Sequence, residues 1–103
     1  MYSRITLVEI DTMRIDLDDA VALFREHVLP GLHEQAGYEG SLVLTTPDGK
    51  GLIMTLWETE VAAVTAAAFA SSELERYMTL FRAPPGREHY EVAFAELPAA
   101  TVA

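Results

Sequence analysis

Four side chains of this sequence could do chemistry on a small organic molecule, and each also has a plainer structural reading. Trp57 can donate its indole N–H to a substrate oxygen and stack on an aromatic ring, or it can anchor the core. Tyr77 can donate or relay a proton from an apolar helical stripe, or carry its hydroxyl to the surface. Arg82 can pair with an anion, or complement a helix dipole. His27 can act as a base near neutral pH, or lie half in water beside a buried helical face.

The remaining titratable groups do not form a recognisable metal or cofactor site. His89 and Glu91 share one face of a predicted strand, but the sequence offers no third ligand near them. His27 and His33 are about 120° apart around an ideal helix, which makes them a poor metal pair. The sequence has no P-loop and no GxGxxG motif, and it contains no cysteine. We therefore expect no metal, no cofactor and no thiol chemistry.

The composition indicates one acidic domain that is rich in apolar residues. The 103 residues carry a net charge of -9 and are 50% hydrophobic, with a mean hydropathy of +0.17. Because this charge repels phosphate groups, nucleic acid and anionic membrane surfaces are disfavoured as partners. No stretch approaches the roughly 20 apolar residues that cross a bilayer, and the N-terminus lacks a signal-peptide pattern. We expect residues 1–103 to form a single cytoplasmic domain.

A strand and a kinked helix are expected to hold His27. Residues 2–10 are apolar and β-branched, with apolar side chains on both faces of the predicted strand. Asp16 can cap a helix that runs to about Ala36, where Gly37 stops it. Pro30 removes a hydrogen bond and should kink this helix near residues 26–30. The buried stripe at helical spacing consists of Leu17, Ala20, Val21, Phe24, Val28 and Leu32.

A hairpin is expected to hold Trp57. Residues 38–46 and 51–58 are apolar runs on either side of "PDGK", and Asp-Gly between two such runs is a clear turn signal. Because both faces of the hairpin carry apolar groups, neither face is marked as the one that meets solvent. The expected pairing places Leu42 and Leu44 with Ile53, Thr55 and Trp57 on one face, and Val43 with Leu52, Met54 and Leu56 on the other.

The remaining elements are two helices and a strand. An Ala-rich helix is expected from about residue 59 to 70, and the capping-box pattern "SELE" at residues 72–75 should open another helix. "APPG" at 83–86 ends that second helix, and residues 88–97 read as a fourth strand. The stripe of the second helix consists of Leu74, Tyr77, Met78 and Phe81.

The resulting order β-α-β-β-α-β predicts an α+β, ferredoxin-like fold with an antiparallel four-stranded sheet. Such a sheet carries its helices on one face only, so one apolar face stays uncovered within a single chain. Burial of apolar area gains about 25 cal/mol per Å². We therefore expect a homodimer in which the uncovered faces of two copies meet.

Two segments resemble a known family. "VLPGLHEQAGYEGSLVL" is similar to the region where a helix ends near a proline and a Gly-aromatic-x-Gly turn leads into strand two. "LIMTLWETEVAA" resembles a strand three that ends in Trp-Glu-Ser/Thr-Glu before the next helix. Together these segments resemble antibiotic biosynthesis monooxygenase-like proteins of the dimeric α/β-barrel superfamily, and the likeness spans residues 2 to about 97.

The resemblance implies a function. Members of this family hold a pocket between sheet and helices, and some oxidise aromatic polyketides with O₂ and no cofactor. The implied activity is a cofactor-independent monooxygenase acting on a small aromatic metabolite. The alternatives are a non-oxidative binding protein or isomerase for a small hydrophobic molecule, and a dimer with a filled pocket and no ligand. The sequence contains no asparagine, so the Asn that characterised quinone-forming members and haem degraders use is missing.

The resemblance also implies roles for particular residues. Trp57 would be donor and stacking platform, Tyr77 a proton relay, Arg82 an anion partner and His27 a base. Whether the chain is catalytic at all stays open at this point. The residues expected to bind the substrate are Tyr38, Phe24, Met78 and Phe81.

Overall fold

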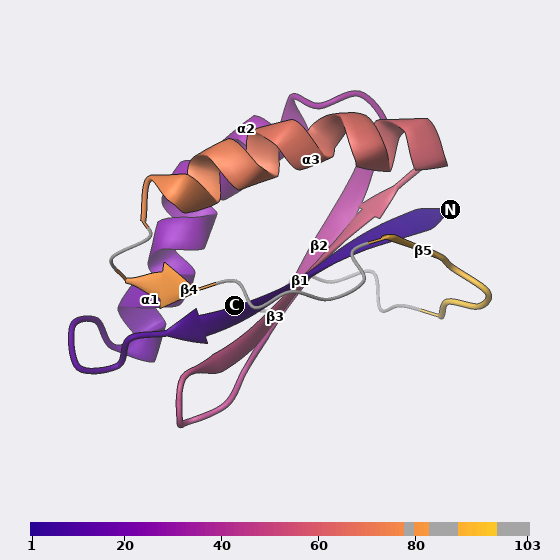
Figure 1. The fold of residues 1–103 in the computed structure, drawn as a ribbon. Coiled ribbons are helices and arrows are strands. Elements are labelled where there is room, and N and C mark those ends of the chain that lie inside the picture. Colours follow the sequence, from indigo (N-terminus) through magenta and orange to yellow (C-terminus); the bar gives the residue numbers. More distant parts are fainter. Residues whose placement is uncertain (78–79, 83–88, 97–103) are drawn as a thin grey trace.

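An antiparallel sheet with helices packed on one of its faces forms the fold (Figure 1). The computed structural model describes residues 1–77, 80–82 and 89–96. The elements in chain order are β1 (Tyr2–Ile10), α1 (Leu17–Leu23), the π-helical segment η1 (Phe24–Val28), α2 (Leu29–His33), β2 (Tyr38–Thr45), β3 (Lys50–Trp57), α3 (Glu60–Glu75), β4 (Phe81–Arg82) and β5 (His89–Glu91).

The strand order is β2-β3-β1-β4, with β5 also paired to β1. All of these pairs are antiparallel. Because β3 occupies one edge of β1, the strands β4 and β5 share its other edge: β4 lies beside Glu9 and Ile10, and β5 lies beside residues 2–4. The two short strands together fill the fourth position of the sheet. The predicted ferredoxin-like α+β fold is therefore confirmed, and the sheet does not close on itself.

The helical segment after β1 shows the predicted irregularity. Asp16 caps α1, since its carboxylate accepts the backbone N–H of Asp19 at 2.8 Å. In η1 the chain takes a π-helical turn, and the N–H of Leu29 bonds to the carbonyl of Phe24, five residues earlier. Pro30 follows directly, and its missing N–H and bulky ring account for a break in the regular ladder at this place. The predicted kink is confirmed, while α2 ends at His33, three residues before the predicted end.

The β2–β3 hairpin forms at the predicted place but with a different register. Its turn needs a glycine, because Gly49 has φ of 90° and a Cβ there would lie 2.6 Å from the carbonyl oxygen of Ile10. Leu42 pairs with Met54, and Val43 pairs with Ile53. The predicted register is therefore wrong by one residue. Leu42 and Leu44 share a face with Met54 instead of Ile53, and Val43 shares a face with Ile53 instead of Met54.

The region after β3 also differs from the prediction. A single helix, α3, continues through residues 72–75, where the capping-box pattern predicted the start of a second helix. No glycine or proline lies between Glu60 and Glu75 to interrupt it. Phe81 is not helical, because it pairs with β1 as part of β4. The predicted fourth strand at 88–97 is confirmed only at 89–91, and residues 88 and 97 lie outside the described residues.

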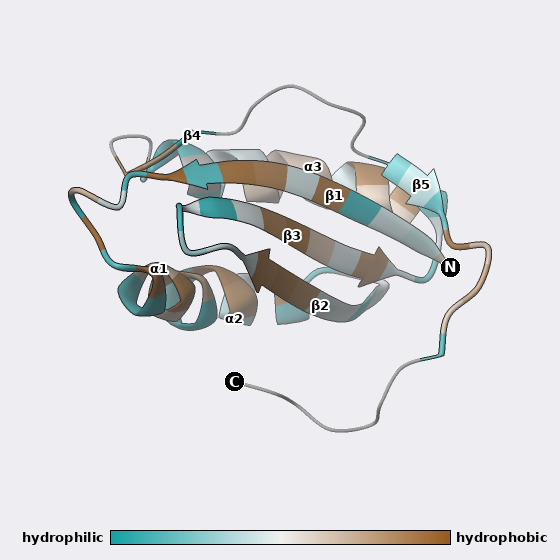
Figure 2. Ribbon diagram, turned by 90° about the horizontal axis from the view of Figure 1, so that it is seen from below, coloured by the Kyte–Doolittle hydropathy of each residue, from teal (hydrophilic) through white to brown (hydrophobic). Residues whose placement is uncertain are grey.

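The sheet has one covered face and one open face. Arg4, Thr6 and Val8 of β1 lie on the covered face, opposite Thr55, Ile53 and Gly51 of β3. Figure 2 looks onto the open face, and the ribbon shows stretches of apolar residues along β1, β2 and β3. We call its central side chains the open-face cluster: Ile5, Leu7, Leu42, Leu44 and Met54.

The core lies at one end of the space between the sheet and the helices. Trp57 at the end of β3 is 1% exposed and packs with Leu32 of α2 and with Ala63 and Ala66 of α3. The alanines let α3 approach the sheet closely at this end. Within the described ranges, the helices are too short or too polar to span a lipid bilayer.

Candidate functional site

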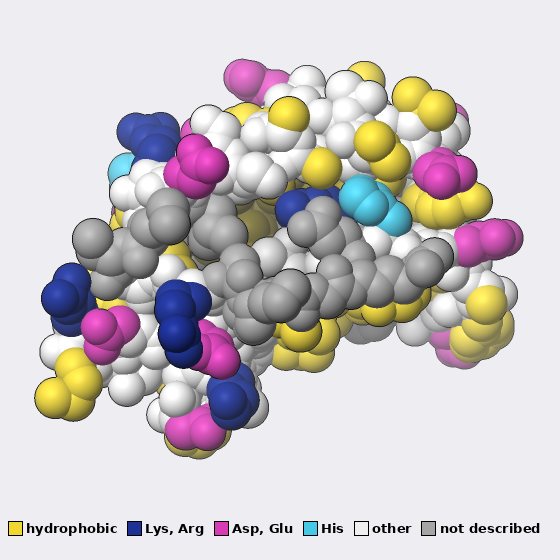
Figure 3. Space-filling model, viewed as in Figure 1, with side chains coloured by type: hydrophobic (Ala, Val, Ile, Leu, Met, Phe, Trp, Pro, Cys, Tyr) yellow, Lys and Arg dark blue, Asp and Glu magenta, His cyan; other side chains and the backbone are white. Residues whose placement is uncertain are grey.

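A pocket lies between the sheet and the helical layer, next to the core. It is formed by β1, β2 and β3 on one side and by α1, η1, α2 and the end of α3 on the other. The space that the centre of a water molecule can reach is about 100 Å³, and all empty space together, open solvent at the mouth included, is about 990 Å³. Figure 3 shows a recess between the two layers with hydrophobic side chains inside it. The lining is mainly apolar, which suits a small hydrophobic ligand.

Small residues explain why this half of the interior is open. Ala20, Gly51, Ala66 and Ala70 all line the pocket, and they come from both layers. In the core, by contrast, the large ring of Trp57 fills the space between the sheet and the helices. The pocket therefore results from a cluster of small side chains beside one large side chain, that of Trp57.

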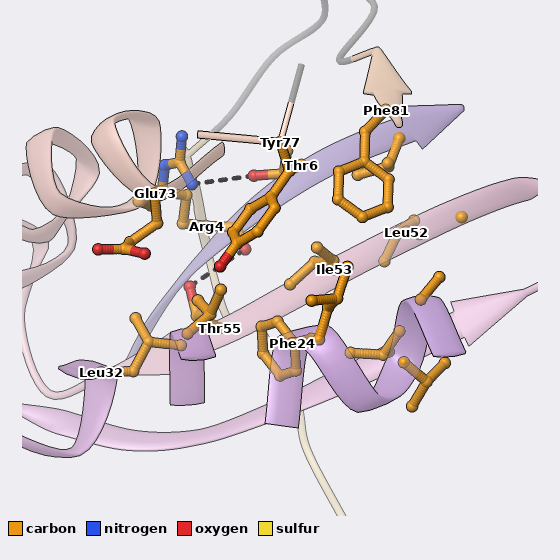
Figure 4. Close-up of a pocket in the computed structure, with 18 of the residues that line it drawn as sticks. Arg4, Thr6, Phe24, Leu32, Leu52, Ile53, Thr55, Glu73, Tyr77 and Phe81 are labelled. Carbon is orange, nitrogen blue, oxygen red and sulfur yellow. Dashed lines mark hydrogen bonds between the residues drawn. The ribbon is translucent and has the colours of Figure 1, made fainter. Parts of the chain in front are cut away.

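Most of the polar residues of the pocket lie in one part of it (Figure 4), while Thr45 lies apart from them, beside Gly51. Arg4, Thr6 and Thr55 project from the sheet, while Glu73 and Tyr77 come from the end of α3 and the turn after it. Arg4 is only 7% exposed, and its Nη1 donates to Thr6 Oγ1 at 2.9 Å. We call these five residues the polar end of the pocket.

Glu73 brings a carboxylate to the polar end. Its side chain is 14% exposed, and Oε2 lies 3.4 Å from Nη1 of Arg76, which is itself largely in solvent. Glu73 lies two residues before Glu75, where α3 ends, and Arg76 and Tyr77 follow as a turn. A carboxylate that faces an apolar pocket and keeps a route to solvent can take up a proton and release it again.

Trp57 lines the pocket, but its polar atom is engaged within the protein. The indole N–H donates to Thr55 Oγ1 at 2.8 Å, and the ring meets Tyr38 edge-on at 5.4 Å between centroids. The structure thus gives Trp57 the core-anchor role that the sequence left open. Its role as a donor to substrate stays a prediction, and it would require the bond to Thr55 to break.

Tyr77 and His27 are brought together, but only Tyr77 lines the pocket. Their rings are 6.4 Å apart between centroids, and Tyr77 also meets Phe81 edge-on at 6.2 Å. His27 is exposed on η1. The phenol of Tyr77 is therefore in a position to pass a proton to or from a molecule in the pocket, whereas His27 would have to act through Tyr77.

Arg82 lies outside the pocket. It is exposed, and its Nη2 forms an ion pair with Glu9 Oε2 at 2.6 Å across β4 and β1. The hydrogen bond from Arg82, followed by its positive charge, lowers the pKa of the Glu9 carboxyl below its usual value of 4.5. Arg82 therefore ties β4 to the sheet, and the structure does not bring it to the other predicted site residues.

The predicted substrate-binding residues divide in the same way. Phe24 of η1 and Phe81 of β4 both line the pocket. Tyr38 is not among the lining residues; it packs behind Trp57, and its hydroxyl donates to Ser41 Oγ at 2.9 Å. Met78 lies outside the described residues.

Sequence reasoning missed Arg4 and Glu73. Arg4 lies in an apolar strand and pairs with Thr55 on the covered face. In the sequence, only the alternation of side chains along β1 indicated which face Arg4 occupies. Glu73 was assigned to a helix cap, although on a continuous helix it lies seven residues after Ala66, two turns along the same face. In both cases the signal was a charged residue spaced from buried residues by the repeat of its own element, two residues for the strand and about 3.6 for the helix.

No metal centre is visible in the part of the chain that the structure describes. None of its groups of three or more His, Asp or Glu residues is placed to hold an ion. His89, in β5, is the register partner of Arg4 on β1, so its strand position brings it to the covered face.

Two solved structures share this architecture. The crystal structure of NE2512, a protein of unknown function from Nitrosomonas europaea, matches with a TM-score of 0.68 at 20% identity, covering 96% of this chain and 95% of that chain. A monooxygenase from the gene ActVA-Orf6 of Streptomyces coelicolor, in complex with the ligand Nanaomycin D, matches with a TM-score of 0.60 at 19% identity, covering 95% and 92%. No protein-family model matches the sequence, and comparison with curated proteins gives no match either.

These comparisons establish the fold. The chain shares its ferredoxin-like fold with these two proteins over nearly its whole length, which agrees with the fold that the sequence predicted. Both matches cover more than nine-tenths of each partner, so the pocket belongs to a part of the fold that the matched proteins also have.

Proposed function

We propose that this chain is a cofactor-independent monooxygenase that oxidises an activated CH₂ group in a small, flat aromatic molecule. The observation that carries the proposal is the apolar pocket with ionisable groups in one part of it. The likeness to a monooxygenase crystallised with Nanaomycin D adds support, because that protein has the same fold. An apolar recess favours a planar aromatic body, and the polar end supplies the groups that proton chemistry needs.

The reaction needs only the substrate and O₂. A base removes one proton from a CH₂ group between two aryl rings, and the resulting carbanion transfers an electron to O₂. The two radicals combine to a peroxide anion, which takes back the proton held by the base; the resulting hydroperoxide loses water to leave a carbonyl. Two C–H bonds are broken and one C=O is formed; carbon loses four electrons, and O₂ gains four as one carbonyl oxygen and one water. The protein supplies the base and the donors that stabilise developing negative charge.

The residues at the polar end can fill these roles. Glu73 is the proton acceptor in this proposal, since it lines the pocket and its carboxylate, which is paired with Arg76, is mostly buried. Tyr77 is the donor to the oxygen that becomes negative, and the apolar walls keep water from the carbanion. Replacing the predicted base His27 by Glu73 follows from the position of His27 outside the pocket lining.

A non-oxidative binding protein or isomerase is the second candidate. Two observations favour it: the N–H of Trp57 is engaged by Thr55, and the chain contains no asparagine. Under this candidate the same pocket binds a small hydrophobic molecule, and no O₂ is consumed.

Oxygen consumption separates the two candidates. We expect the protein to speed the oxidation of anthrone in air, seen as O₂ uptake together with the absorbance of anthraquinone. Tyr77→Phe should slow the reaction by about 10²-fold, because a donor to the developing oxyanion is lost. Tyr38→Phe should leave the rate close to that of the unsubstituted protein, because Tyr38 lies behind Trp57 and not in the pocket. Binding without O₂ uptake would support the second candidate and overturn the first.

We also propose that the chain works as a homodimer joined through the open-face cluster. Leu7, Leu42 and Leu44 are 42%, 48% and 51% exposed, which places several large apolar side chains side by side in water. A second copy presents the same apolar surface, so a two-fold axis through the sheet would bury both clusters at once. Such a contact places the pocket on the far side of each sheet, away from the interface.

Charge on the open face should separate the dimer. We expect sedimentation at micromolar concentration to give about twice 11.3 kDa for the unsubstituted chain, and 11.3 kDa for Leu44→Glu. Val61→Glu is the matched control, because Val61 is 75% exposed on the helical side, and it should stay dimeric. Circular dichroism checks that both variants are folded. A stable 11.3 kDa particle from the unsubstituted chain would contradict the proposal.

A further inference from the structure

The pocket has a second end, away from its polar end, and aliphatic side chains line it. On β3 the two ends are marked by Thr55 and Gly51, which lie about 13 Å apart along an extended strand. In Figure 4, Phe81 lies on the side of the pocket opposite to Arg4 and Glu73. We call the following residues the far end of the pocket: Val8, Ile10, Ala20, Val21, Leu23 and Gly51.

Gly51 has no side chain at a place where the backbone does not require a glycine. It lies in a strand that is paired on both edges, with Val8 of β1 and Thr45 of β2. Its φ is not positive, and a Cβ built on it would lie 3.8 Å from the Cβ of Val8 and 3.5 Å from the carbonyl oxygen of Leu44, which are ordinary contacts. Glycine inside a strand costs stability relative to alanine, because it loses more conformational freedom on folding and packs no side chain. The fold therefore does not account for Gly51, whereas space for a ligand does.

The chemistry of the far end suits a hydrocarbon group. Val8 from the sheet and Ala20 from α1 are both 6% exposed, and the side chains that line the pocket beside them are aliphatic. Thr45, beside Gly51, is exposed, so its hydroxyl stays in water. A polar group of a ligand would lose its water among the aliphatic side chains without gaining a hydrogen bond. The part of a ligand that lies at the far end is therefore apolar.

We infer that the far end binds a saturated alkyl substituent, so that the ligand is an aromatic compound with an alkyl tail rather than an unsubstituted ring system. This inference deepens the proposed function and rests on it for the reacting ring at the polar end, but binding of a tail can be measured without any reaction. The tail extends from the ring toward Gly51, where the missing side chain leaves room for it. Each methylene that leaves water for these surroundings strengthens binding about fourfold.

The test uses a series of para-alkylacetophenones in which the alkyl group grows from methyl to octyl. Trp57 is the only tryptophan of the chain and lines the pocket, so quenching of its fluorescence reports binding there. We expect the dissociation constant to fall about fourfold for each added methylene until the far end is full, and then to stay level. We also expect para-butylacetophenone to bind more tightly than acetylnaphthalene, which adds the same number of carbons as a flat ring, by more than their partitioning into hydrocarbon explains.

Variants on both layers locate the tail. Gly51→Val should end the series at a shorter alkyl group and leave binding of the methyl compound unchanged, because valine fills the far end. Ala20→Leu should have the same effect from the helical layer. Gly40→Val is the matched control, because Gly40 lies on β2 outside the pocket lining and a Cβ there would meet Leu56 Cδ1 at 3.9 Å. The full series should remain in this control.

Gly51→Ala separates a role in ligand binding from a role in the fold. It should raise the midpoint of thermal unfolding by a few degrees, because alanine restricts the unfolded chain, and it should weaken binding of the octyl compound. A lower midpoint would show that the fold needs Gly51 and would overturn the inference.

The binding series has its own outcomes against the inference. It would be overturned by affinities that do not change with tail length, by no binding of any member, by relatively tighter binding of acetylnaphthalene, or by an unshortened series in Gly51→Val. If Gly51→Val fails to fold, Ala20→Leu and the series on the unsubstituted protein decide. The full series in a protein that consumes no O₂ would keep the inference and reject the oxygenase, whereas oxidation of anthrone without the series would do the reverse.

Discussion

Glu73→Gln should lower the rate of anthrone oxidation by about 10²- to 10⁴-fold, the range that a positioned general base contributes. Glutamine keeps the size of the side chain and its contact with the pocket, but it cannot accept a proton at neutral pH. The loss should appear in kcat, since the apolar walls that bind the aromatic body are unchanged. The measurement is O₂ uptake and quinone absorbance over a range of substrate concentrations.

The control for this variant is Glu75→Gln, two residues further along α3 on an exposed position. It changes the net charge by the same amount and should keep the rate within about twofold. If Glu73→Gln and Glu75→Gln have equal rates, Glu73 is not the proton acceptor. A loss that appears only in KM would assign Glu73 to binding instead of proton transfer.

Trp57→Ala should destabilise the fold by about 3–5 kcal/mol, the usual loss for removing a buried aromatic side chain. Trp57 is 1% exposed, and its ring packs on Tyr38 and Leu32 at the centre of the core. The alanine would extend the pocket into the core and leave Thr55 without the indole donor. Urea unfolding followed by circular dichroism at one fixed protein concentration measures the change.

Trp57→Phe tests the role of the indole N–H separately from the packing. Phenylalanine keeps an aromatic ring in the core, so it should cost less stability than alanine. If the variant oxidises anthrone at close to the original rate, the predicted donor role of Trp57 is wrong. A loss of less than about 1 kcal/mol for Trp57→Ala would instead show that Trp57 does not anchor the core.

The order and type of the elements could be predicted because the sequence carries strong local signals for them. Apolar strands, the Asp-Gly turn and Pro30 each act within a few residues, and each has its predicted effect in the structure. The hairpin register could not be predicted, because both faces are apolar and a slip by one residue leaves no polar side chain buried. Only pairing with β1, which sets Thr55 opposite Arg4, settles the face of each residue.

The end of α3 shows a second kind of limit. "SELE" fits a helix start and a helix interior equally well, and no glycine or proline decides between them. Phe81 lies at helical spacing from Tyr77, yet its backbone pairs with Ile10 of β1. Contacts distant in sequence therefore outweighed local preference at this point.

The candidate site was predictable only in part, for the same reason. Phe24, Tyr77 and Phe81 line the pocket as predicted, because apolar stripes point to the interior whichever element carries them. Arg82 was predicted at the end of a helix, but it lies on β4 and pairs with Glu9. Arg4 and Glu73 come together from the first strand and the last helix, and no local pattern links residues so far apart.

The position of β2 at the edge of the sheet has a consequence for how this protein would aggregate. Among the described residues it is the outermost strand on its side of the sheet and is eight residues long, so one row of its backbone amides and carbonyls has no neighbouring strand there. It contains neither proline nor lysine, the residues that commonly block lateral addition of another strand. When the protein is heated or crowded, this border is where chains would add to one another and begin to grow fibrils.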